Sequence, residues 1–135
     1  MELILGGFAQ GKLDFALSRC PDACVFEDGD YRELFSADDS CGSTSRQIVW
    51  NKFHLAVKKE IEAGKSDEEI TQVVSAVVAR QKKIVIISDE IGCGIVPMSA
   101  DERRYRELVG RLQCFLAGKA DAVYRVFCGV PQRIK

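Results

Sequence analysis

The sequence predicts an α/β protein in which helices cover a mainly parallel sheet, giving three layers. Short apolar runs alternate along the chain with stretches of helical periodicity, and a glycine-rich turn joins the first run to the first such stretch. Strands that are separated by helices usually pair in parallel. The chain has 135 residues, of which 47% are hydrophobic and 29% charged, so we expect residues 1–135 to form a single domain.

The apolar runs and the helix signals place the individual elements. We expect strands at residues 3–5, 23–26, 47–50, 83–88 and 122–127, the last of them closing the fold. Helices are expected to begin at Lys12, just before Phe53, and after two capping-box sequences that start at Ser66 and Ser99. Gly118 is expected to end the last helix. Residues 27–46 are acidic and then polar, which predicts an irregular exposed segment.

The turn after the first predicted strand carries a phosphate-loop pattern. Gly6, Gly11 and Lys12 match the first part of G-x-x-x-x-G-K-[ST], where glycines let backbone amides approach phosphate and the lysine binds it. The predicted nucleotide-binding residues are Gly6, Gly7, Phe8, Ala9, Gln10, Gly11, Lys12 and Leu13. A phosphate loop in an α/β chain with a mainly parallel sheet predicts a P-loop NTPase-like fold. The alternative is a glycine-rich turn between a strand and a helix, with a solvated lysine.

A second candidate group stands where the strand at 83–88 ends. Asp89 and Glu90 follow directly, in the position where a carboxylate would hold Mg²⁺ or its water opposite a phosphate loop. We predict catalytic roles for Lys12, Asp89 and Glu90, with Asp89 as a Mg²⁺ ligand. The alternative is a solvated acidic pair. His54 is interpreted as a structural or surface histidine.

Charge, hydropathy and cysteine spacing exclude several classes of protein. A net charge of −1 gives no reason to expect binding to nucleic acid or to an anionic membrane, and no apolar run is long enough to span a bilayer. We expect a cytoplasmic protein. The six cysteines lack the spacing of a zinc site. They are expected to be reduced and mostly buried.

The last third of the chain resembles a known family. The block from Val85 to Pro97, Val-Ile-Ile-Ser-Asp-Glu-Ile-Gly-Cys-Gly-Ile-Val-Pro, is similar to the Asn-Glu-Val-Gly-x-Gly-Ile-Val-Pro block of adenosylcobinamide kinase / adenosylcobinamide-phosphate guanylyltransferase. The likeness continues through residues 103–106 and 110–111 to the closing Cys-Gly-Val-Pro-Gln-Arg-Ile-Lys. The glycine loop stands where that family has its phosphate loop.

This resemblance implies a transferase of cobalamin biosynthesis that works with GTP or ATP and Mg²⁺. The family phosphorylates a hydroxyl of the corrinoid adenosylcobinamide, then transfers GMP through a guanylylated histidine, and is often a trimer. It implies a homo-oligomer here. It also places Glu90, Gly92, Gly94 and Pro97 in the wall of the neighbouring substrate site, with Arg111 on phosphate or at a subunit contact.

Three departures from the family pattern limit what the resemblance implies. Leu13 stands where the family has a Mg²⁺-binding hydroxyl, and Asn51 aligns with its strand-end acid. The segment that should carry the guanylylated histidine is shorter and holds none, so guanylyl transfer by that route is not expected. Asp89 replaces an asparagine of the family block and is predicted to supply the missing carboxylate. The rival interpretations are a non-catalytic nucleotide- or corrinoid-binding relative and a kinase for another alcohol.

Overall fold

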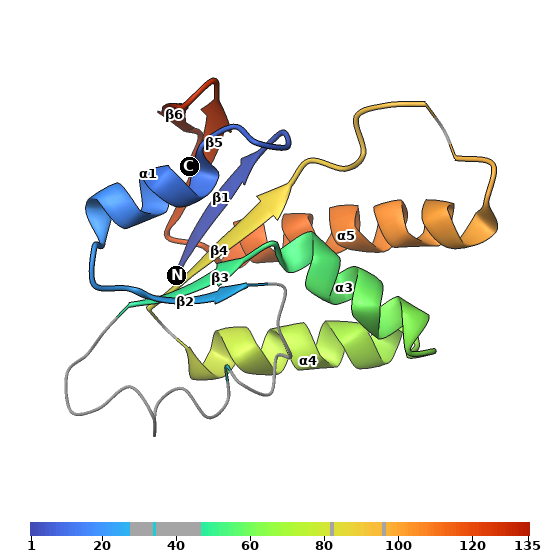
Figure 1. Cartoon of the computed structure of the whole chain (residues 1–135). Helices are drawn as coiled ribbons and strands as arrows, with labels where there is room; N and C mark the ends of the chain where they lie inside the picture. Colours follow the sequence, from blue (N-terminus) through green and yellow to red (C-terminus); the bar gives the residue numbers. More distant parts are fainter. Residues whose placement is uncertain (28–33, 35–46, 82, 96) are drawn as a thin grey trace.

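A six-stranded sheet forms the centre of the protein. The computed structural model describes residues 1–27, 34, 47–81, 83–95 and 97–135, and within them the strand order is β2-β3-β4-β1-β5-β6 (Figure 1). The strands are β1 (Glu2–Gly6), β2 (Cys24–Glu27), β3 (Ile48–Asn51), β4 (Ile84–Asp89), β5 (Ala122–Phe127) and β6 (Val130–Arg133). All pairings are parallel except that of β5 with β6. The predicted α/β fold with a mainly parallel sheet is confirmed.

Helices cover both faces of this sheet, which confirms the three layers (Figure 1). Helix α1 (Lys12–Arg19) packs on one face, and α3 (Phe53–Glu62), α4 (Asp67–Arg80) and α5 (Ala100–Lys119) pack on the other. Strand β4 shows how one sequence serves both layers. Ile84 and Ile86 belong to the core under α3–α5, whereas Val85 and Ile87 belong to the core under α1, because successive side chains of a strand point to opposite faces.

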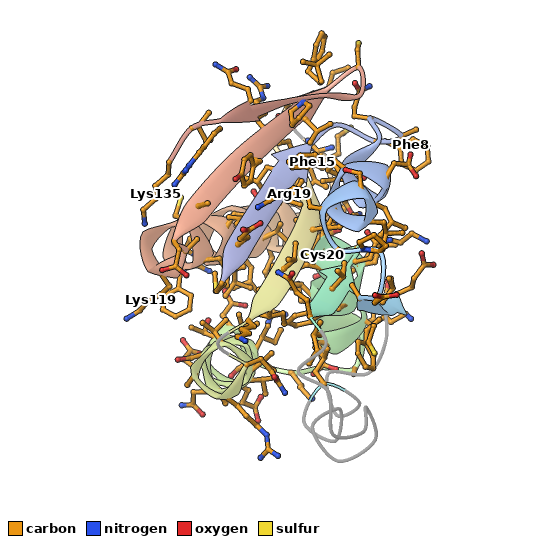
Figure 2. All side chains as sticks on the ribbon, turned by 90° about the vertical axis from the view of Figure 1, so that its left-hand side faces the viewer. Phe8, Phe15, Arg19, Cys20, Lys119 and Lys135 are labelled. Atoms are coloured by element: carbon orange, nitrogen blue, oxygen red, sulfur yellow. The ribbon has the colours of Figure 1, made fainter. Side chains whose placement is uncertain are left out.

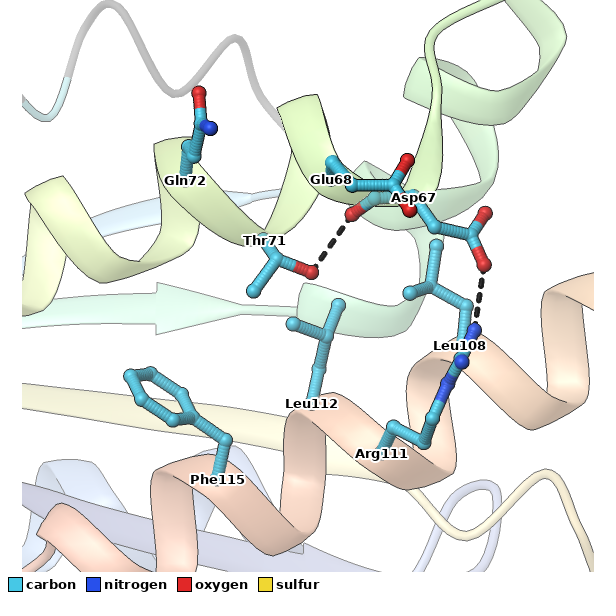
Figure 3. A pocket seen from close by; sticks show the side chains of 8 residues that line it. All are labelled: Asp67, Glu68, Thr71, Gln72, Leu108, Arg111, Leu112 and Phe115. Carbon is cyan, nitrogen blue, oxygen red and sulfur yellow. Dashed lines mark hydrogen bonds and ion pairs between the residues drawn. The ribbon is translucent and has the colours of Figure 1, made fainter.

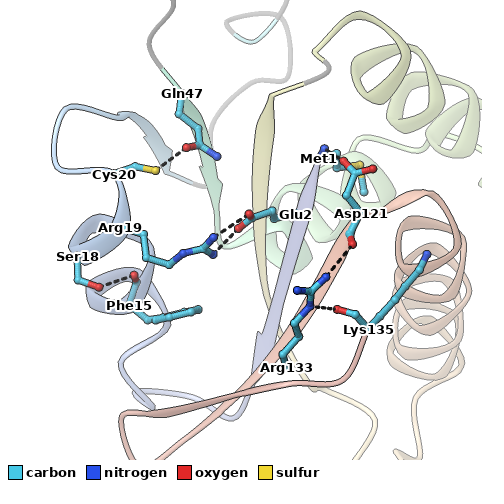
Figure 4. Close-up of polar contacts among 10 residues, drawn as sticks. All are labelled: Met1, Glu2, Phe15, Ser18, Arg19, Cys20, Gln47, Asp121, Arg133 and Lys135. Carbon is cyan, nitrogen blue, oxygen red and sulfur yellow. Dashed lines mark hydrogen bonds and ion pairs between the residues drawn. The ribbon is translucent and has the colours of Figure 1, made fainter.

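The start of β1 is held by polar contacts with its neighbours (Figure 4). The amino group of Met1 lies 2.6 Å from Oδ2 of Asp121. The guanidinium of Arg19 donates to both carboxylate oxygens of Glu2, and this hydrogen bond raises the pKa of Arg19. The guanidinium of Arg19 also lies over the rings of Phe15 and Tyr124. The contacts of Arg19 therefore hold the last turn of α1 against the start of β1 and against β5.

Several expectations about single elements need correction. The chain does not close with β5, since β6 follows and forms a hairpin with it. Gly118 does not end α5, which continues to Lys119. The capping box at Ser66 forms, but the side chain of Ser99 makes no capping bond. Of the predicted irregular segment 27–46, only Glu27, the last residue of β2, and the buried Leu34 fall among the described residues.

The cysteines also differ from the expectation of buried, reduced thiols. Cys93, Cys114 and Cys128 are free and exposed, and Cys20 is free and half-buried. The Cys20 thiol donates to the side-chain oxygen of Gln47 (Figure 4). Cys24 is disulfide-bonded, so the prediction of reduced thiols is wrong there. Within the described residues, no helix has the length and apolar character needed to cross a membrane.

Candidate active site

The loop between β1 and α1 depends on two glycines of the sequence pattern. A Cβ atom at Gly6 would lie 2.4 Å from the carbonyl oxygen of Val126, so only glycine lets β1 pass this close to β5. Gly11 has φ +80° and occupies the N-cap of α1, a backbone conformation that favours glycine. The path of the backbone therefore requires glycine at position 6 and favours it at position 11, whether or not a ligand is bound.

Hydrogen bonds fix this loop at its base and along one side. The backbone N–H of Glu90 donates to the carbonyl of Gly6 over 3.0 Å. Gln10 accepts twice from the β5–β6 turn: its side-chain oxygen from the N–H of Cys128, and its carbonyl from the N–H of Gly129. Phe8, by contrast, is 86% exposed and projects from the loop (Figure 2). The loop is thus anchored to two strand ends while its tip stays open to solvent.

Lys12 is folded into the loop and is buried. Its Nζ atom donates to the carbonyl of Gly7 and lies 2.6 Å from Oδ1 of Asp89. The register of the parallel strands explains the meeting, because Gly6 at the end of β1 pairs with Asp89 at the end of β4. The structure thus brings together two of the three predicted catalytic residues.

His54 adds a third polar group that the sequence interpretation did not assign to the site. It lies in the first turn of α3, is buried, and its Nδ1 accepts from the backbone N–H of Asp89 over 3.1 Å. Its Nε2 lies 3.6 Å from Oδ2 of the same residue. Because Nδ1 accepts, neutral His54 carries its proton on Nε2, facing the carboxylate. The sequence did hold one signal, since α3 begins directly after the end of a strand adjacent to β4.

Burial lowers the pKa of His54 below the ordinary histidine value. The neighbouring charges act in both directions: Asp89 raises this pKa, while Lys12 and Lys52 lower it. Desolvation has the largest effect, since it penalises the charged imidazolium. The site therefore favours neutral His54 beside the ion pair of Lys12 and Asp89.

Gln113 of α5 is a further residue that sequence reasoning missed. Its side-chain nitrogen donates to the carbonyl of Asp89 and to the hydroxyl of the fully buried Ser88, each over 2.9 Å. No motif marked it, because a single glutamine beside the apolar face of a helix is an ordinary feature. His54 of α3 binds the backbone N–H of Asp89, and Gln113 of α5 binds its carbonyl, so two helices hold the backbone of Asp89.

Asn51 does not stand in for the acid that the family pattern has at this point. Its amide nitrogen donates to Oε1 of Glu27 over 3.1 Å, and its amide oxygen accepts from the backbone N–H of Lys52 over 3.0 Å. Lys52 in turn lies 3.1 Å from Oε2 of Glu27. These bonds tie the ends of β2 and β3 to each other and occupy the asparagine side chain.

The remaining candidates divide between the loop after β4 and the far side of α5. Glu90 lies 3.1 Å from Arg125 on β5. Gly92 and Gly94 are exposed, and the carbonyl of Pro97 accepts from Arg103 over 3.0 Å. The loop after β4 is therefore held to β5 at its start and to α5 at its end.

Arg111 is placed in another environment. It pairs with Asp67 at the start of α4, beside a cavity of about 430 Å³ between α4 and α5 (Figure 3). Arg104 binds the other oxygen of Asp67 over 2.8 Å. Arg111 is therefore joined to α4 by this contact, and none of its ion pairs among the described residues involves the glycine loop.

The residues present fit Mg²⁺ best as an ion that is bound together with a nucleotide. The described part of the chain holds no group of three or more histidine, cysteine or acidic side chains that could form a metal cage. Leu13 offers no hydroxyl, and Asn51 is occupied. Mg²⁺ is commonly bound by one or two carboxylates together with substrate phosphates and water. Asp89 fits that role, as a single carboxylate beside Lys12.

Comparison with known proteins gives the family. The sequence model of the cobinamide kinase / cobinamide phosphate guanyltransferase family matches residues 45–134, well over half of the chain. The chain belongs to this family. The resemblance noted from the block at 85–97 is thereby confirmed. The cobinamide kinase family has a P-loop NTPase-like fold, which agrees with the sheet and the loop described above. The glycine loop itself lies before the matched region.

Two curated relatives match about half of the chain. The bifunctional adenosylcobalamin biosynthesis protein CobU of Salmonella typhimurium is 36% identical over 69 residues, which is 51% of this chain and 38% of that protein. The protein of the same name from Escherichia coli is 36% identical over 67 residues, or 50% of this chain and 37% of that protein. The matches thus cover little more than a third of each relative's length.

Proposed function

We propose that this member of the cobinamide kinase family binds a purine nucleoside triphosphate at the glycine loop and uses it as a phosphoryl donor. The observation that carries the proposal is the pairing of Lys12 with Asp89, 2.6 Å apart where β1 and β4 end side by side. A phosphate-binding lysine next to a strand-end carboxylate is the arrangement used by nucleotide-dependent phosphotransferases. The family supports an alcohol of a corrinoid, adenosylcobinamide, as the acceptor.

Each residue of the site has a role in this proposal. The backbone amides of residues 7–11 and the N-terminus of α1 bind the phosphates, and Lys12 binds their terminal oxygens. Mg²⁺, bound with the nucleotide and held by Asp89, would neutralise charge on the transferred group. The acceptor oxygen bonds to the γ-phosphorus, the bond to the bridging oxygen breaks, and the hydroxyl proton passes to a carboxylate. Glu90, next to the loop, is the candidate for that proton.

The structure favours the kinase step over guanylyl transfer. Transfer of GMP through a covalent intermediate needs an accessible nucleophile such as imidazole. His54 is the only histidine of the chain. It is buried, and both of its ring nitrogens face Asp89. His54 is therefore poorly placed to attack a nucleotide.

A second function is favoured by the altered positions Leu13 and Asn51. Both replace Mg²⁺ ligands of the family pattern, and Asn51 is occupied by Glu27. A relative that binds nucleotide or corrinoid without turning it over, as a regulatory or assembly subunit, would retain the loop and lose these groups. Assembly as a homo-oligomer, for instance a trimer, is compatible with either function.

Calorimetric titration of GTP and of ATP, with and without Mg²⁺, tests the proposal. We expect Mg²⁺ to strengthen binding to the wild type and Lys12→Ala to abolish it. Lys119→Ala, which removes the same charge from an exposed position at the far end of α5, is the matched control and should bind normally. Phosphorylation of adenosylcobinamide by the wild type would then establish the kinase. Binding that ignores Mg²⁺ would support the non-catalytic function, and no binding by the wild type would refute both nucleotide proposals.

A further inference from the structure

We propose that Asp89 is an exchangeable counter-ion of Lys12. In the free protein, Asp89 neutralises the ammonium of Lys12. When nucleotide binds, Lys12 binds the phosphate instead, and Asp89 can then bind the accompanying cation. The inference rests on the proposed nucleotide site and adds to it a coupling between the binding of nucleotide and the binding of cation. The same carboxylate opposes binding of the nucleotide alone and favours binding of the nucleotide together with its cation.

The first observation is that Lys12 is already satisfied without any ligand. The side chains of Lys12 and Asp89 are only 8% and 17% exposed, and their charged atoms are 2.6 Å apart. A second proton of the ammonium is donated to the carbonyl of Gly7. A phosphate that arrives at the loop therefore has to compete with Asp89 for the ammonium. It also brings negative charge close to the carboxylate.

The second observation is that Asp89 cannot readily follow Lys12 if the lysine moves. Its N–H is bonded to His54 of α3 and its C=O to Gln113 of α5, while the strand that carries it is paired with β1. Its Oδ2 faces the Nε2 of His54 at 3.6 Å. After the lysine turns to phosphate, the carboxylate thus stays at the end of β4, oriented and without its former counter-ion.

It follows from these two observations that nucleotide and cation bind cooperatively. Without a divalent cation, binding of phosphate breaks an ion pair and leaves an uncompensated carboxylate of low exposure, which is unfavourable. With the cation present, that carboxylate gains a new partner. By linkage, the factor by which the cation strengthens nucleotide binding equals the factor by which the nucleotide strengthens cation binding. Asp89 would carry most of this coupling.

The variant Asp89→Asn separates the two effects, because it keeps the shape of the side chain and removes its charge. We expect the nucleotide that binds wild type to bind Asp89→Asn about tenfold tighter in EDTA, since Lys12 is no longer neutralised. We expect the strengthening by Mg²⁺ to be largely lost. Asp22→Asn removes an equal charge from the exposed turn between α1 and β2 and should leave both quantities unchanged.

Other results would overturn the inference. If Asp89→Asn binds nucleotide more weakly in EDTA, or as the wild type does, then Asp89 does not compete for Lys12. If Mg²⁺ strengthens its binding as much as in wild type, Asp89 is not the group that meets the cation. These results differ from failure of the proposed function, in which the wild type itself binds no nucleotide and the inference falls with it.

A reciprocal measurement covers the case in which Asp89→Asn does not fold. Mg²⁺ alone is titrated into wild type and into Lys12→Met, both without nucleotide. Removal of the ammonium should expose Asp89 to cations, so Lys12→Met should bind Mg²⁺ at least several-fold more tightly than wild type. Equal Mg²⁺ binding by the two proteins would contradict the exchange.

Discussion

The Nζ atom of Lys12 lies 2.6 Å from Oδ1 of Asp89 and joins the loop after β1 to the end of β4. This ion pair makes a prediction about stability that is independent of any ligand. Lys12→Met should lower the free energy of unfolding by about 1–3 kcal/mol, because it leaves a carboxylate of low exposure without its partner. Adding Asp89→Asn to Lys12→Met should recover part of that loss.

Urea unfolding of the wild type, both single variants and the double variant measures this coupling. A double variant at least as stable as Lys12→Met supports a direct interaction between the two side chains. Strictly additive losses would show that the pair contributes nothing beyond its separate residues.

His54 provides a pH-dependent NMR signal that needs no sequence-specific resonance assignment, since it is the only histidine in the sequence. Its imidazole protons should titrate in the NMR spectrum with a pKa below 6.5, because burial, Lys12 and Lys52 outweigh the opposing effect of Asp89. A midpoint at or above 6.5 would contradict the placement of His54 in the interior.

The same shift predicts the direction in which stability changes with pH. Since the folded protein holds His54 neutral, the unfolded chain binds more protons between the lowered pKa and the ordinary value near 6.5. The free energy of unfolding should therefore fall as the pH is lowered from about 7 through this window. His54→Gln should weaken that dependence, and urea unfolding at a series of pH values would measure the difference between the two proteins.

Among the glycines that the structure describes, Gly6 leaves the least room for a side chain. A Cβ there would lie 2.4 Å from the backbone oxygen of Val126, so Gly6→Ala must push β1 and β5 apart. We expect a loss of about 1–3 kcal/mol in unfolding free energy, together with weaker nucleotide binding. Gly118→Ala is the matched control, because nothing lies within 4 Å of its Cβ and alanine favours a helix by about 0.5–1 kcal/mol. A Gly6→Ala protein as stable as wild type would contradict the close approach of the two strands.

Most of the fold and part of the site could be predicted from the sequence. The apolar run before Gly6 and the run before Asp89 identify two buried strands, and parallel pairing then brings their carboxyl ends together. The contact of Lys12 with Asp89 follows from that pairing. Local patterns sufficed because both residues stand at the ends of strongly patterned elements.

The remaining groups depend on tertiary contacts that local patterns do not encode. His54 reaches Asp89 only because the chain turns at Lys52, with φ +55°, directly from β3 into α3. Strand β6 was missed because all its residues are exposed and it contains Pro131, which is tolerated at a sheet edge. Gln113 and Arg111 lie on one helix and bind different neighbours, so their roles could not be separated without the fold.

The two serines before α4 and α5 show how far a capping sequence predicts a bond. Both begin a Ser-x-x-Glu pattern, but only Ser66 accepts from the backbone N–H of Glu69 and has its own N–H bonded by that side chain. Ser99 makes no side-chain cap. Ser66→Ala should therefore lower the unfolding free energy by about 1 kcal/mol, whereas Ser99→Ala should change it by much less. Thermal and urea unfolding of the two variants side by side measure the difference, and equal losses would mean that Ser99 caps α5 in solution after all.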